Sequence, residues 1–89
     1  MDSLGFEKFL IAHDRIESKN KAVVSRLTKA AWIENNLKID LDMIISNPRA
    51  VLSLRADIYR KAPTPRYAGN IYNALRWYFY NTYQKTPVF

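Results

Sequence analysis

The chain has 89 residues, 48% of them hydrophobic and 25% charged, so it is long enough for one domain with its own core and too short for a separate catalytic lobe. A net charge of +6 favours a polyanionic partner, which is a nucleic acid, an acidic protein or an anionic lipid surface. The absence of cysteine excludes disulfides and thiolate metal sites. No apolar run approaches the length of a membrane span and no signal peptide is evident, so we expect a cytoplasmic protein without membrane association.

The first predicted element is a short helix capped by Asp2 or Ser3. Its inward-facing residues are expected to be Leu4, Phe9, Leu10 and Ile16. His13 is the single histidine, and it has no second histidine, cysteine or close pair of carboxylates to act with. Neither a metal ligand nor a catalytic base is therefore indicated, and we expect His13 at the surface.

Residues 18–20 read as a break and a new N-cap, followed by a second helix from Lys21 to Leu37. Its expected apolar face is made of Val23, Val24, Leu27, Ala30, Ala31 and Ile33. Cations crowd the start of this helix, although the helix dipole favours cations at the other end. They are Lys19, Lys21, Arg26 and Lys29. This placement indicates either a functional surface or an ordinary solvated face. Trp32 is expected at the edge of the core.

Two further helical elements follow. Asp40 is expected to cap a short turn that covers the core, and Asn47 with Pro48 predicts a helix that runs to about Lys61. The apolar residues expected inside are Leu41, Met43, Ile44 and Ile45 of the turn and Val51, Leu52, Leu54, Ile58 and Tyr59 of the helix. Because only a short connection leads to the next helix, these two helices are expected to be neighbours.

The last helix is predicted from the Thr64 cap and Pro65 to Tyr83. One side carries the apolar stripe Ala68, Ile71, Tyr72, Leu75, Phe79 and Tyr83. The other side carries groups able to bind phosphates, base edges and bases, namely Arg66, Asn70, Asn73, Arg76, Trp77 and Tyr80. Residues 84–89 have little pattern and read as a tail or linker. The sequence thus predicts one all-α domain over residues 1–89, a compact bundle of four main helices plus a short helical turn.

Two runs stand out in this order of elements, Phe6-Glu7-Lys8-Phe9-Leu10 in the first helix and Asn73-Ala74-Leu75-Arg76-Trp77-Tyr78-Phe79 in the last. With the basic second helix and the capped turn between them, they resemble the N-terminal core-binding domain of phage integrases and other tyrosine recombinases. That family's SAM-like helical domain forms one jaw of a clamp around the recombination site. The chain lacks the family's arginine, histidine and tyrosine catalytic machinery, and its second helix lacks the usual threonine and tyrosine. The resemblance therefore implies DNA binding without enzyme activity.

The resemblance also implies which residues contact DNA, at the start of the second helix and in the first half of the last. These positions are Lys19, Asn20, Lys21, Ser25, Arg26, Thr64, Arg66, Tyr67, Asn70 and Asn73. Duplex DNA is the implied partner, together with a catalytic domain or other recombinase subunits, and no metal or cofactor is expected. The isolated domain is expected to be a monomer. Arg76 either belongs to this surface or pairs with a carboxylate such as Asp57.

A protein-interaction domain is the alternative function. Its partner would bind an exposed aromatic patch of Trp32, Trp77, Tyr78 and Tyr80. Cations gathered on one face favour DNA binding, whereas an uninterrupted aromatic patch with scattered charges favours the interaction domain. A free-standing enzyme is not expected, because no nucleophile, base and orienting group can be assembled from these residues.

Overall fold

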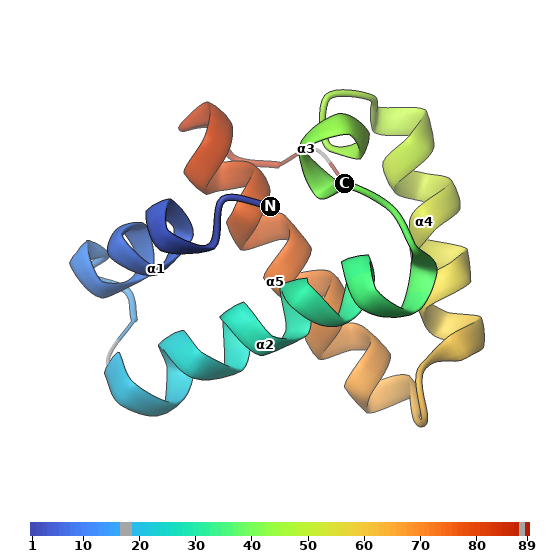
Figure 1. The fold of residues 1–89 in the computed structure, drawn as a ribbon, viewed down its shortest axis with the longest axis horizontal. Helices are drawn as coiled ribbons and strands as arrows, with labels where there is room; N and C mark the ends of the chain where they lie inside the picture. The colour runs from blue at the N-terminus through green and yellow to red at the C-terminus, as the bar shows by residue number, and fades with distance from the viewer. Residues whose placement is uncertain (17–18, 88) are drawn as a thin grey trace.

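Five helices follow one another in this computed structural model, which describes residues 1–16, 19–87 and 89, and these residues contain no β-strand. The helices are α1 (Ser3–Ala12), α2 (Lys19–Leu37), α3 (Leu41–Ile44), α4 (Pro48–Lys61) and α5 (Pro65–Tyr83) (Figure 1). The predicted all-α bundle of four main helices and one short turn is confirmed. No helix in the described part of the chain combines the length and the apolarity that crossing a membrane requires.

Side-chain caps fix where four of the helices begin. Asp2 accepts from the amide of Gly5, Asp40 from that of Asp42, and Thr64 from that of Tyr67, at 2.9–3.0 Å. Asn47 accepts from the first-turn amides of α4, which begins at Pro48 as predicted. These contacts satisfy amides that have no partner within the helix.

The start of α2 differs from the prediction. The helix begins at Lys19, two residues early, so Lys19 and Asn20 are helical and Asn20 is not a cap. Ser18, the remaining candidate for the cap, lies outside the described residues. The ammonium of Lys19 donates to the carbonyl of His13 at 2.6 Å and so ties this helix start to the preceding turn.

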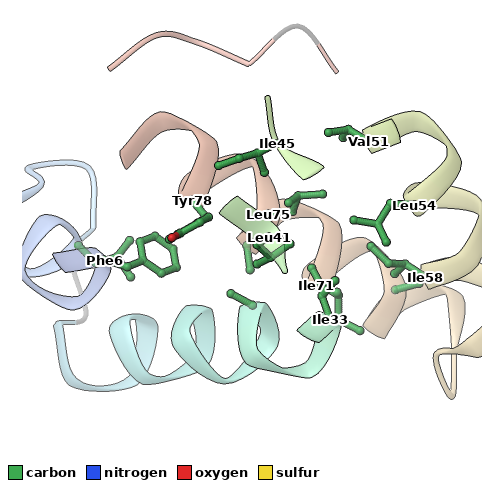
Figure 2. Packing of buried hydrophobic residues seen from close by; sticks show 14 of the residues in the cluster. Phe6, Ile33, Leu41, Ile45, Val51, Leu54, Ile58, Ile71, Leu75 and Tyr78 are labelled. Carbon is green, nitrogen blue, oxygen red and sulfur yellow. The ribbon is translucent and has the colours of Figure 1, made fainter. Parts of the chain in front are cut away.

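Helix α5 lies at the centre of the bundle, where it packs against α1, α2 and α4 (Figure 1). Its fully buried residues are Ala68, Ile71, Ala74, Leu75 and Tyr78. Figure 2 shows Leu75 and Ile71 among side chains from α2, α3 and α4. The ring of Tyr78 meets that of Phe6 of α1 edge to face, with centroids 5.0 Å apart. The predicted contact between α4 and α5 is confirmed.

The buried side of α5 is rotated about the helix axis relative to the predicted apolar stripe. Ala74 and Tyr78 belong to the core, while Tyr72 and Phe79 are only partly buried and Tyr83 is 37% exposed. The reason is that α5 has helices on more than one side. Ala74 lies two turns after Tyr67, on the side that contacts α2, so the core extends around that side.

Several apolar residues predicted to face inward are instead exposed. They are Leu4 of α1, Val24 of α2, Met43 of α3, and Leu52 and Tyr59 of α4. In α1 the buried residues are Phe6 and Leu10, one turn apart, although Phe6 was not predicted as core. All four of these helices carry apolar residues on more than one side, so spacing alone does not single out the buried side.

Half of the acidic residues lie around one polar cluster on the Tyr78 side of α5. The Met1 ammonium donates to Glu34 at 2.8 Å and lies 3.4 Å from Asp42 and 3.7 Å from Asp40. The Tyr78 hydroxyl accepts from the amide of Asp2 at 2.8 Å and donates to Asp42. Burial, aided by the bond to Asp42, raises the pKa of Tyr78, and the bond to Glu34 raises that of the Met1 ammonium.

Candidate nucleic-acid interface

Helices α2 and α5 meet at the surface through two cation–aromatic pairs. The guanidinium carbon of Arg26 lies 5.4 Å from the ring centroid of Trp77, and the ammonium nitrogen of Lys29 lies 5.4 Å from that of Tyr67. Lys29 also donates to the hydroxyl of Ser25 at 2.6 Å. Because aromatic rings rather than carboxylates hold these cations, their positions are fixed while their charges stay available to a partner.

Two further arginines extend this group along α5. Arg15, in the turn after α1, has its guanidinium carbon 5.2 Å from the centroid of Trp77. Arg15 and Arg76 line one open pocket of about 200 Å³ together with Asn73, Trp77 and Tyr80 of α5 and Thr86 and Pro87 of the C-terminal segment. The alternative pairing of Arg76 with Asp57 is not found, since Asp57 bonds to Arg60 instead. Arg76 therefore belongs to the same surface as Arg15.

We define a basic face from these four cations and from two exposed cations on the same helices. Its members are Arg15, Lys21, Arg26, Lys29, Arg66 and Arg76. In the described part of the chain, no acidic side chain forms an ion pair with any of them. The Nε atoms of Arg26 and Arg76 are buried and have no hydrogen-bond partner. Burial lowers the pKa of Arg26 below its ordinary value. An arginine nevertheless stays charged at neutral pH.

The acidic cluster around the Met1 ammonium, which holds four of the eight acidic residues, lies on the opposite side of α5. Tyr78 points into the acidic cluster, whereas Tyr80 lines the basic pocket. Two residues along an α-helix correspond to a turn of about 200°, so these two tyrosines leave the helix on opposite sides. The basic face and the acidic cluster are therefore segregated across the central helix.

The structure brings seven of the ten predicted DNA contacts into this region. Ser25, Arg26, Tyr67 and Asn73 take part in the contacts just described. Arg66 and Asn70 are exposed two turns and one turn before Asn73, at spacings that place all three on the same side of α5. Lys21 is exposed one turn before Ser25.

The remaining three predicted contacts have different surroundings. Lys19 is occupied by the carbonyl of His13, and the side chain of Thr64 is occupied by its capping bond to Tyr67. Asn20 shares the helical stripe of Val24, Leu27 and Ala31, the last two of which line a groove against α1. Asn20 is exposed, and its helical position is on the side of α2 that borders α1 further along the helix and not on the side that meets α5.

Sequence reasoning missed Arg15 and did not place Lys29 among the contacts. Lys29 had a usable signal, because it lies one turn after Ser25 and Arg26. Arg15 lies in a turn without helical periodicity, so no pattern connects it to α5.

His13 and two of the aromatic residues, Trp77 and Tyr78, differ from their predicted surroundings. His13 is partly buried, with its ring 4.8 Å from Trp77 and 5.6 Å from Tyr80. The predicted exposed aromatic patch is interrupted, because Tyr78 is fully buried and Trp77 lies beside two guanidinium groups. Trp32 packs at the edge of the core, as predicted.

No family model, curated protein or solved structure matches this chain significantly.

Proposed function

We propose that this domain binds duplex DNA through the basic face, as a clamping module similar to the core-binding domain of tyrosine recombinases and without strand cleavage of its own. The observation that carries the proposal is the segregation of charge across α5. Cations held by aromatic rings cover one side, and three carboxylates gather around the Met1 ammonium on the other. A surface of this kind attracts a polyanion and releases its counterions.

The polar residues between the cations suit a duplex. Arg66 and Arg76 flank Asn70 and Asn73 along one side of α5, so cations suited to phosphates stand on either side of amides suited to base edges. The longest dimension of the domain is 31 Å, slightly less than the roughly 34 Å of one DNA turn. A single copy therefore contacts at most about one turn, and we expect weak binding with little sequence preference in isolation.

The test is the salt dependence of binding to a random duplex, measured by fluorescence anisotropy. The test variant replaces Lys21, Lys29 and Arg66 with alanine. If each cation meets one phosphate, the slope of log affinity against log salt should flatten by roughly 2–3 units, at about 0.9 per phosphate. Circular dichroism checks that the variant is folded, which we expect because none of the three residues belongs to the buried core.

A control variant removes the same charge elsewhere, through Lys8→Ala, Lys38→Asn and Arg49→Ala. All three residues are exposed, and asparagine suits the left-handed backbone of Lys38, whose φ is 55°. Its slope should flatten by less than that of the test variant. Equal loss in both variants would mean that only the overall field of a basic protein attracts DNA, and the proposed surface would be wrong.

A further inference from the structure

The pocket beside Trp77 is lined more specifically than a surface needs to be if it attracts polyanions by positive charge alone. Its walls come from three separate segments, which are the turn after α1, the exposed side of α5 and the C-terminal segment. Arg15 and Arg76 supply two guanidinium groups, Asn73 an amide, and Tyr80 and Thr86 hydroxyls. Among the residues that the structure describes, no carboxylate lines the pocket. Every polar side chain in its wall is therefore able to donate a hydrogen bond.

One donor in the wall already lacks a partner. The Nε atom of Arg76 is buried and makes no hydrogen bond, which is unfavourable for a donor removed from water. Because the buried Nε is closed to the pocket, an anion there would accept from the terminal nitrogens of Arg76 and from the guanidinium of Arg15 together. Guanidinium groups form short, paired hydrogen bonds with phosphate oxygens in this way.

The size and surroundings of the pocket select among anionic ligands. At about 200 Å³ it is smaller than the 300–1,000 Å³ typical of sites that enclose a whole small molecule. Both Arg15 and Arg26 lie within 5.4 Å of the Trp77 ring, and His13 meets it edge to face, so the ring is not free to stack on a nucleobase. A compact group with several acceptor oxygens fits these constraints.

The C-terminal segment completes the pocket. Thr86 and Pro87 form one wall, and Phe89 packs against Tyr72 and Phe79 with ring centroids 6.2 and 5.0 Å apart. These aromatic contacts hold the segment alongside α5. The wall of the pocket therefore depends on Phe89, a residue that does not itself line it.

We propose that this pocket binds one phosphate group, either as the free anion or as a phosphodiester of nucleic acid, between Arg15 and Arg76 with the C-terminal segment as its outer wall. The phosphate site rests on the geometry of the pocket alone. Only the identification of its phosphate as a phosphodiester of DNA rests on the proposed function.

The experiment titrates inorganic phosphate into ¹⁵N-labelled protein and follows the indole N–H signals of the two tryptophans. Trp77 borders the pocket, whereas Trp32 lies at the edge of the core and serves as the internal control. We expect the Trp77 signal to shift and saturate while that of Trp32 stays in place. A Trp77 signal that does not respond, or a shift that never saturates, would overturn the proposal.

Variants connect the binding to the named residues. Arg15→Gln and Arg76→Gln should each weaken phosphate binding at least about tenfold, because each removes charge-assisted hydrogen bonds. Arg15 is exposed, so its variant tests the site even if Arg76→Gln is poorly folded. Phe89→Ala should weaken binding through the loosened wall. Arg49→Gln, an exposed arginine outside the pocket, is the matched control, and an equal loss there would refute a specific site.

Two further ligands identify the source of the phosphate. A dinucleotide with a single phosphodiester and a random DNA duplex are each tested for competition with inorganic phosphate. Competition by both supports a DNA phosphodiester as the natural ligand. Saturable phosphate binding without competition by duplex would confirm the pocket and refute its DNA source. Duplex binding that does not shift the Trp77 indole signal would refute the pocket as a phosphate site but would not contradict the proposed function.

Discussion

Replacing Tyr78 with phenylalanine tests the polar cluster that joins α1, α3 and α5. The substitution keeps the ring and its edge-to-face contact with Phe6, and it removes only the hydroxyl. Two bonds are lost, one accepted from the amide of Asp2 at 2.8 Å and one donated to the carboxylate of Asp42. A bond to a charged group contributes about 1.5–3 kcal/mol and a neutral bond about 1 kcal/mol.

The expected loss is smaller than the sum of these two values. The side chain of Asp42 is 50% exposed, so its carboxylate regains hydrogen bonds to water in the variant. We therefore expect Tyr78→Phe to lower the free energy of unfolding by about 1–3 kcal/mol, out of the roughly 5–15 kcal/mol typical of a domain. The corresponding fall in Tm is roughly 4–8 °C per kcal/mol for a chain of this size.

Urea unfolding followed by circular dichroism measures this loss, with Tyr83→Phe as the control. Tyr83 is exposed and its hydroxyl makes no hydrogen bond within the described residues, so its variant should change stability by less than about 0.5 kcal/mol. A Tyr78→Phe variant as stable as the control would show that the hydroxyl does not connect the three helices.

Three further predictions concern the fold. Leu75→Ala should cost about 2–5 kcal/mol in urea unfolding, since Leu75 is fully buried on α5, and a cost below about 0.5 kcal/mol would contradict that position. Thr64→Ala should cost about 0.5–2 kcal/mol through loss of the α5 cap, and Thr64→Ser should restore most of it. Stability should fall as pH rises above 8.0, because the raised pKa of the Met1 ammonium means that the folded protein keeps this proton longer than the unfolded chain. A thermal-melt series in which Glu34→Gln has the same pH dependence as the parent would contradict this.

The helices could be predicted from the sequence because their signals are local. Asn47 with Pro48 and Thr64 with Pro65 mark the starts of α4 and α5, and each pair acts within one turn. The buried side of each helix was less predictable. It depends on which neighbours surround the helix, and α5, with helices on several sides, buries Ala74 and Tyr78 where periodicity alone favours Tyr72 and Phe79.

The candidate site was predictable only where it lies on helices. The exposed side of α5 followed from spacing, and so did the cations of α2. The pocket beside Trp77 did not, because Arg15 comes from a turn and Thr86 and Pro87 come from a segment without pattern. These parts meet only in the folded chain, and no local rule relates them to one another.

Charge segregation explains how a module with eight acidic residues could bind a polyanion as proposed. The acidic cluster and the basic face lie on opposite sides of α5, and a helix with its side chains is about 10–12 Å across. Screening at physiological salt has a range of about 8 Å. DNA bound at the basic face would therefore experience the nearby arginines strongly and the distant carboxylates weakly. On the proposed function, the local set of cations, more than the net charge of +6, would determine binding under these conditions. In about 0.01 M salt the screening range rises to about 30 Å, beyond the 20 Å thickness of the domain, and the acids on the far side then oppose binding as well.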